Sequence, residues 1–247
     1  MLERIAKRHD VAWVLTRPDR PAGRGRRQRA PAAKVAAERL ELEVRQPERP
    51  TLDDIADVET IVLVAYGVLI PDDLLAGALW LNVHPSLLPR WRGAAPVERA
   101  LLEGDGETGV SIIKLVKELD AGPVAAQRAF RIGEEDDAGA IYERSAELAA
   151  ALLDEVLPDP TFREQEGEPT YAHKLEASDR QLDLADPEDA LRRIRALSPH
   201  IGARAELNGR PVTIWRARLE DGKLVPLEVQ PDGRRRMTYE EFRRGLR

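Results

Sequence analysis

The stretch from Leu81 to Pro123 constrains the fold more than any other part of the chain. Its sequence is LNVHPSLLPRWRGAAPVERALLEGDGETGVSIIKLVKELDAGP. The pattern predicts a short strand that Pro85 ends, a turn-rich run, and a helix from about Ala94, with a proline in its first turn where a missing N–H costs nothing. A second apolar run, Val110–Leu115, predicts another strand. It leads to Asp120 in the turn signal Asp-Ala-Gly-Pro.

This pattern places three polar side chains at the ends of strands. Asn82 and His84 are two residues apart, so an extended backbone projects both to one face of the sheet. In an open α/β sheet, ligands bind at the edge where such strands end. The groups suit acyl transfer to an amine: an amide N–H stabilises an oxyanion, an imidazole holds or moves a proton, and Asp120 would orient that imidazole.

The same three residues also fit a structural interpretation. Asn82 is typical of a strand-end turn, His84 of a half-buried imidazole with satisfied hydrogen bonds, and Asp120 of a turn residue. Spacing alone favours this structural interpretation.

The longer string NVHPSLLPRWRGAAP, followed by LDAGP, changes that balance. It strongly resembles the signature of the folate-dependent formyltransferase family, and the resemblance runs from about Leu2 to the C-terminus. In that family an Asn, a His and an Asp form the catalytic trio, which implies these roles for Asn82, His84 and Asp120. The resemblance also implies an α/β, Rossmann-like formyltransferase domain with a smaller, β-rich, OB-like C-terminal domain.

The family resemblance implies 10-formyltetrahydrofolate as co-substrate. From the residues alone, the apolar run Ile61–Ala65 predicts a strand covered on both faces, followed by a turn into a helix at Asp72. In the family, the segment after this strand offers backbone groups to the pterin ring. The folate contacts implied for this chain are Val68, Leu69, Ile70, Ser86, Leu87, Leu88 and Pro89.

The N-terminus differs from the family pattern. Residues 1–9 predict the end of a short amphipathic helix and Val11–Thr16 a strand, whereas family members open with a further strand and a glycine-containing loop. We therefore expect the native start to lie upstream, with Met1 at an internal start codon. A chain beginning at Met1 would leave strand edges without a partner in the sheet.

Residues 17–29, RPDRPAGRGRRQR, carry six arginines and one aspartate. Such a run is usually a solvated loop. It is also suited to binding phosphate groups, because glycines let the backbone come close to a phosphate and arginines make bidentate contacts with it. Its first part is similar to a loop that tRNA-formylating family members insert into the acceptor arm. The predicted tRNA contacts are Arg20, Arg24, Arg26, Arg27, Arg90 and Arg92.

The predicted organisation is a catalytic domain over residues 1–157, a polar linker over 158–169 and an OB-like tRNA-binding domain over 170–247. Helices are predicted over Pro31–Leu42 and Ile141–Leu157. In the C-terminal part, Asp186-Pro187 predicts a capped helix to about Leu197. Hairpins are predicted at Asn208-Gly209 and Asp221-Gly222, and Thr238 with Glu241 predicts a capping box on a last helix.

Composition limits the function classes. The net charge of −6 at pH 7 argues against a generic nucleic-acid coat protein, so any RNA contact must come from a local basic patch. The chain has no cysteine, which excludes disulfides and thiolate metal sites and fits a cytoplasmic protein. With four histidines besides, a metal site is not expected. The longest apolar run, Ile61–Ile70, is too short to span a bilayer.

The resemblance implies that the chain formylates the amino group of initiator methionyl-tRNA for translation initiation, and we expect it to act as a monomer in the cytoplasm. A first alternative is a formyltransferase that acts on an amino sugar or another small amine with the same trio. A second is a catalytically impaired folate- or RNA-binding homologue, suggested by the short N-terminus.

Overall fold

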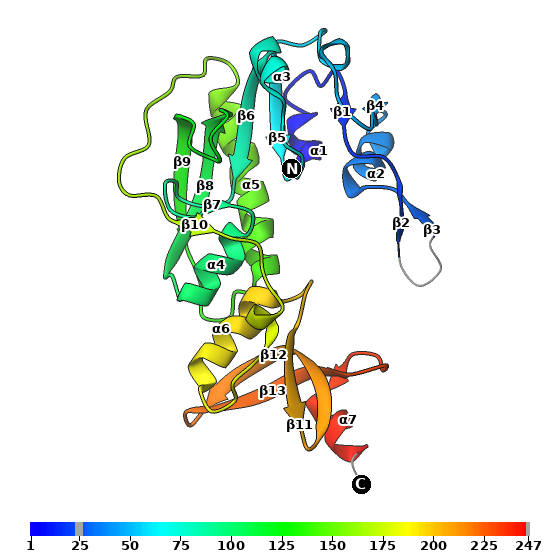
Figure 1. The fold of residues 1–247 in the computed structure, drawn as a ribbon, viewed down its shortest axis with the longest axis vertical. Helices are drawn as coiled ribbons and strands as arrows, with labels where there is room; N and C mark the ends of the chain where they lie inside the picture. Colours follow the sequence, from blue (N-terminus) through cyan, green and yellow to red (C-terminus); the bar gives the residue numbers. More distant parts are fainter. Residues whose placement is uncertain (23–26, 246–247) are drawn as a thin grey trace. The chain divides into compact units, whose positions relative to one another are not determined.

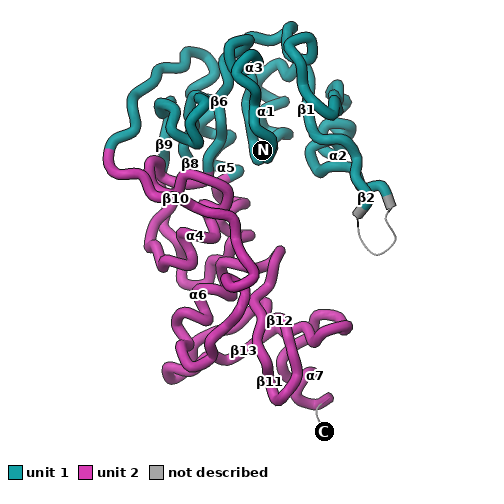
Figure 2. The backbone as a smooth tube through the Cα atoms, viewed as in Figure 1, with its two compact units in different colours: residues 1–84, 110–128, 146–166 teal, residues 85–109, 129–145, 167–247 magenta. Residues whose placement is uncertain are grey.

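The computed structural model describes residues 1–22 and 27–245 of the chain. It divides into two compact units, drawn in different colours in Figure 2. Unit 1 comprises residues 1–84, 110–128 and 146–166, and unit 2 comprises residues 85–109, 129–145 and 167–247. Among the described residues, no helix is long and apolar enough to cross a membrane.

A four-stranded sheet forms the centre of unit 1 (Figure 1), in the order β5 (Thr60–Val64), β6 (Leu79–His84), β8 (Glu107–Lys114) and β9 (Val124–Arg131). The strands β5 and β6 are parallel, and β8 runs antiparallel to β6. The apolar run after Thr60 and the run after Gly109 form β5 and β8, as the sequence predicted.

The two faces of this sheet bury different side chains because successive residues of a strand point to opposite sides. On one face, Leu81 and Ile112 pack with Leu153 of α5 (Ala138–Val156) and with α1 (Leu2–Ile5). On the other face, Trp80 packs with Ile61 and with residues of α3 (Asp72–Gly77). Both sides of the sheet are therefore covered.

A smaller parallel pair lies in the same unit, formed by β1 (Val14–Leu15) and β4 (Val44–Arg45). The helix α2 (Ala32–Arg39) contacts both strands, and a short 3-10 helix, η1 (Leu52–Asp54), follows β4. A cavity of about 570 Å³, lined mostly by apolar side chains, lies between β1 and β5. Both strands are at an edge of their own sheet.

Unit 2 contains α4 (Pro96–Glu103) and a parallel pair formed by β7 (Arg92–Gly93) and β10 (Tyr171–Ala172). Pro96 occupies the first turn of α4, as expected for a proline at a helix start. The helix α6 (Pro187–Leu197) packs against α4, and the short 3-10 helix η2 (Ser178–Arg180) precedes α6.

The C-terminal part of unit 2 is an antiparallel sheet in the order β11 (Ala203–Leu207), β12 (Arg210–Glu220), β13 (Lys223–Pro231) and β14 (Met237–Thr238). The sheet packs on α6 and on α7 (Tyr239–Arg244) around Ile194, Ile214 and Phe242. The two predicted hairpins, the Asp186 cap and the Thr238–Glu241 capping box are confirmed.

Some elements differ from the sequence prediction. The strand predicted over Val11–Thr16 is limited to two residues, and β4 was not predicted because it is equally short and forms by pairing with β1. The strand β9 was also missed. Its sequence VAAQRAFR has few strand-favouring residues, so pairing beside β8 decides its conformation.

Replacing Ile112 by alanine should lower the free energy of unfolding by about 2–5 kcal/mol, because it leaves a cavity at a fully buried position. Urea denaturation followed by circular dichroism measures the change. Val35→Ala, at an exposed position of α2, is the control and should change stability by less than about 0.5 kcal/mol. Equal losses for both variants would contradict the core described above.

Candidate active site

The C-terminal end of β6 carries two of the polar residues singled out from the sequence. In the β6–β8 pairing, Asn82 lies opposite Ile113 and His84 lies opposite Ser111. Alternation along the strand puts Asn82 and His84 on the same face as Trp80, away from the α5 face. Both side chains are buried, with 9% of Asn82 and 4% of His84 exposed.

Asp120 approaches these residues from the turn that follows β8. The Asn82 amide Nδ2 donates a hydrogen bond of 3.1 Å to Asp120 Oδ1. His84 Nδ1 lies 3.6 Å from Asp120 Oδ2, which is too long for a hydrogen bond and within ion-pair range when the imidazole is protonated. The structure thus brings together Asn82, His84 and Asp120, which we call the polar trio.

The polar trio combines three chemical capacities. A carboxamide has two N–H groups, so Asn82 can donate one to Asp120 and still offer the other to an oxygen that becomes negative. The imidazole of His84 can carry or transfer a proton near neutral pH. A carboxylate beside a protonated imidazole stabilises its charge, and burial strengthens that attraction by excluding water.

Two further residues of unit 1 adjoin this site and were not singled out from the sequence. Ser111, fully buried beside His84, accepts a hydrogen bond of 2.9 Å from Gln127 Nε2. A serine directly after Val110 in the apolar run Val110–Leu115 was an available signal. The other residue is Gln165, whose amide Nε2 donates to the carbonyl oxygens of Asp120 and Gly122. Gln165 lies in the predicted linker, and the sequence around it does not indicate a role at this site.

The predicted folate segment Val68–Ile70 follows β5 in unit 1. Leu69 is 85% exposed and Val68 is 43% exposed, whereas Ile70 is buried in the core beneath α3. In the part of the chain that the structure describes, the backbone of these three residues makes no hydrogen bond. Burial raises the pKa of the neighbouring Tyr66 phenol.

The other predicted folate residues, Ser86–Pro89, belong to unit 2. Ser86 is fully buried and its hydroxyl donates a 2.7 Å hydrogen bond to the carbonyl of Arg90. Leu88 is also buried, Leu87 is half-buried, and the carbonyl of Pro89 accepts a hydrogen bond from the amide of Thr170. Most of the side chains in this segment are therefore already packed or hydrogen-bonded within unit 2.

Arg90 and Arg92, both predicted tRNA contacts, lie in the same unit. The Arg90 guanidinium makes two hydrogen bonds to Asp105, which raise its pKa, and it stacks on the indole of Trp91. The Trp91 indole N–H donates to the same carboxylate. Arg92 is half-buried in β7. Nearly half of the Arg90 side chain remains exposed.

The basic segment of residues 17–29 contains two antiparallel strands, β2 (Arg20–Ala22) and β3 (Arg27–Arg29). Arg20 is exposed. Arg24 and Arg26, together with Gly23 and Gly25, lie outside the described residues, and only the backbone of Arg27 is described. At the base, Asp19 accepts hydrogen bonds from Gln46 and Lys34, which lower the pKa of its carboxyl group.

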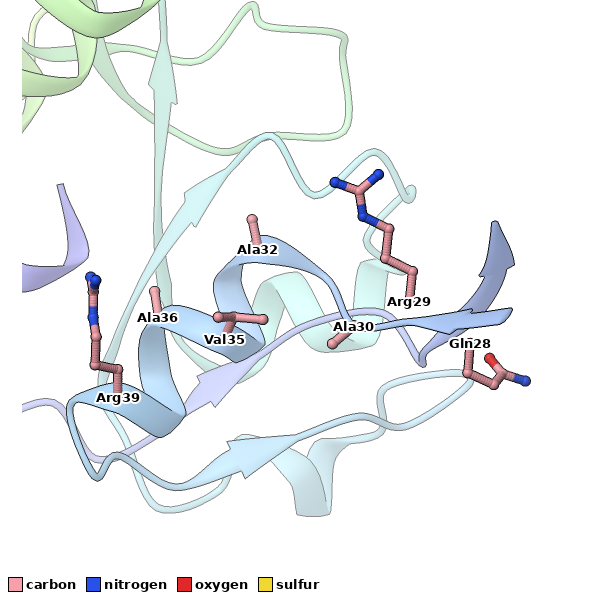
Figure 3. Close-up of a pocket in the computed structure, with 7 residues that line it drawn as sticks. All are labelled: Gln28, Arg29, Ala30, Ala32, Val35, Ala36 and Arg39. Atoms are coloured by element: carbon pink, nitrogen blue, oxygen red, sulfur yellow. The ribbon is translucent and has the colours of Figure 1, made fainter. Parts of the chain in front are cut away.

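A shallow cavity of about 560 Å³ adjoins this segment over α2. Figure 3 shows Arg29 at one end and Arg39 at the other, with Ala32, Val35 and Ala36 between them. Arg39 is ion-paired with Glu3. Arg29 adds an exposed cation that was not among the predicted tRNA contacts.

The described residues contain no group of three or more His, Asp or Glu side chains arranged to hold a metal ion.

Comparisons with known proteins identify relatives for most of the chain. The sequence profile of the formyl transferase family matches residues 2–157. The methionyl-tRNA formyltransferase of Paracoccus denitrificans is 39% identical over 276 aligned residues, which cover 99% of this chain and 93% of the relative.

Two solved structures share the fold. HypX from Aquifex aeolicus in complex with tetrahydrofolic acid superposes with a TM-score of 0.67 at 20% identity, covering 84% of this chain and 43% of that protein. Methionyl-tRNA formyltransferase from Clostridium thermocellum superposes with a TM-score of 0.62 at 19% identity, covering 80% of this chain and 91% of that protein. On the strength of the profile match and the near full-length sequence similarity, the chain belongs to the formyl transferase family, together with the methionyl-tRNA formyltransferases.

Proposed function

We propose that this chain transfers a formyl group from 10-formyltetrahydrofolate to the α-amine of methionine on initiator tRNA. One observation carries the proposal: at the end of β6, the Asp120 carboxylate lies 3.1 Å from the Asn82 carboxamide and 3.6 Å from the His84 imidazole. The name of the Paracoccus denitrificans relative, which aligns over nearly the full length of both chains, supports this acceptor. The tetrahydrofolic acid in HypX supports a folate donor.

In the proposed reaction, the neutral amine attacks the formyl carbon and a C–N bond forms. The carbonyl oxygen becomes negative, and the free Asn82 N–H and protonated His84 stabilise it. Asp120 keeps the imidazole charged and accepts the proton released by the amine. Through a water molecule, that proton passes to the departing folate nitrogen as its bond to the formyl carbon breaks. The folate thus supplies the formyl carbon, and the polar trio stabilises the negative charge and transfers the proton.

The residues after β5 suit a folate ring. A pterin presents hydrogen-bond donors and acceptors along one edge, and the backbone groups of Val68–Ile70 are not engaged within the described residues. Exposed apolar side chains at Val68 and Leu69 add surface for the flat ring. We propose folate contacts from the backbone of these residues, and we also propose Ser86, Leu87, Leu88 and Pro89 as folate contacts.

For the tRNA we propose contacts from Arg20, Arg24, Arg26, Arg27, Arg90 and Arg92. Arginine side chains bind phosphate groups bidentately, and concentrating them in one segment creates a local positive patch on an acidic protein. We further propose that residues 1–157 form the catalytic domain, 158–169 a linker, and 170–247 an OB-like tRNA-binding domain. The antiparallel sheet β11–β14 is the β-rich part of that domain.

The function is tested by incubating the chain with 10-formyltetrahydrofolate and charged initiator tRNA, and measuring N-formylmethionine by mass spectrometry after tRNA hydrolysis. Uncharged tRNA and an amino-sugar nucleotide serve as competing acceptors. Formyl transfer to the charged tRNA alone is expected. Transfer to the sugar alone would replace the proposed acceptor, and transfer to neither would reject the enzyme activity.

Asn82→Ala should lower turnover by about 100- to 1000-fold, because it removes an oxyanion donor. We expect Asp120→Ala to reduce turnover at least as far, with the fold retained. Steady-state formylation rates and circular dichroism provide the measurements. Thr60→Ala, at an exposed position on the neighbouring strand β5, is the control and should keep wild-type turnover. Near-normal turnover in either trio variant would defeat the assignment.

Arg20→Ala should weaken binding of initiator tRNA and flatten its salt dependence, lowering the slope of log K against log salt by about 1, since one phosphate contact is lost. Filter binding between low and physiological salt measures this slope. Arg49→Ala, an exposed arginine outside the basic segment, should leave affinity and slope unchanged. An unchanged slope in Arg20→Ala would remove Arg20 from the RNA contacts.

A further inference from the structure

We propose that Gln165 is a positioning residue for formyl transfer, because its side-chain amide holds the turn that carries Asp120 in place. This inference rests on the proposed function. It assigns a role in catalysis to a residue that lies 45 positions from Asp120 along the chain.

The contact uses both hydrogens of one carboxamide. Gln165 Nε2 lies 2.7 Å from the carbonyl oxygen of Asp120 and 2.8 Å from that of Gly122. These two carbonyls flank Ala121, so a single NH₂ group bridges the turn. Gln165 is half-buried, whereas Glu164 and Glu166 on either side are exposed.

The turn needs such support because its backbone is strained. Asp120 has a φ of +47°, in the left-handed region that residues other than glycine rarely adopt. A conformation of this kind persists only where surrounding contacts fix it, and it is common at active sites. Within the turn, the Ala121 amide makes a long backbone hydrogen bond of 3.3 Å to the Glu118 carbonyl.

Other contacts fix the two flanks of the turn. The Lys114 amide at the end of β8 donates to the carbonyl of Pro123, and the backbone at Gly122 lies so close to the Lys114 carbonyl that a Cβ would not fit. On the other side, Val124 and Arg163 exchange two backbone hydrogen bonds. That exchange fixes the segment from which Gln165 reaches the turn.

The consequence for catalysis is geometric. The Asp120 carboxylate must stay close to both Asn82 and His84, and a backbone that relaxes out of the left-handed region would swing it away. A displacement of about 1 Å can cost roughly 100-fold in rate. Gln165 therefore acts through Asp120 and not on the substrates.

The test combines Gln165→Leu and Gln165→Glu with an Asp120→Ala background. Leucine fills similar space without an N–H. Glutamate keeps the shape of glutamine, but as a carboxylate it accepts hydrogen bonds and donates none. In the full-length chain, each variant should lower kcat by about 10- to 100-fold with little change in the KM for charged tRNA. In the Asp120→Ala background the same replacements should cost nothing further, since the carboxylate they position is absent.

Glu164→Leu, a neighbour with an exposed side chain, is the matched control and should keep wild-type kcat. Amide hydrogen exchange at Ala121 should be faster in both Gln165 variants than in this control, independently of activity. Equal losses of kcat with and without Asp120, or wild-type kcat in both Gln165 variants, would overturn the positioning role and leave the proposed function intact. A wild-type chain that does not formylate charged tRNA would overturn both.

Discussion

The candidate site depends on one interaction, the approach of the Asp120 carboxylate to Asn82 and His84. The two acceptor oxygens of Asp120 face different partners: one accepts from the Asn82 amide and the other faces the imidazole. Because these groups are largely shielded from water, their attraction is stronger than that of an exposed pair. The β6–β8 pairing sets the position of Asn82 and His84, and the turn after β8 sets that of Asp120.

The part of the signature that follows Pro85 is also held by contacts with a segment distant in sequence, within unit 2. The Trp91 amide donates to the Thr170 hydroxyl, and the Arg92 amide donates to the Thr170 carbonyl. At Gly93, which has a φ of +122°, a Cβ would lie 2.7 Å from the carbonyl oxygen of Ala172. Glycine is required there because the two backbones approach so closely.

A common feature links these two supports. In both, residues between 163 and 172 make hydrogen bonds to the backbone of a segment of the formyl transferase signature and hold it in place. The sequence analysis assigned residues 158–169 to a linker because they are polar and lack an apolar period. Composition reports how much apolar surface a segment can bury, but it does not report which backbone carbonyls a side chain will reach.

The sequence alone determined much of this protein. Alternation and apolar runs located β5, β6 and β8, local cap chemistry located α6 and α7, and the spacing of Asn82 and His84 gave their common face. These features depend on contacts between near neighbours, which a sequence records directly. Only tertiary structure decided the strand β9, the left-handed backbone of Asp120 and the reach of Gln165, since each depends on partners that are distant along the chain or on the packing of the sheet.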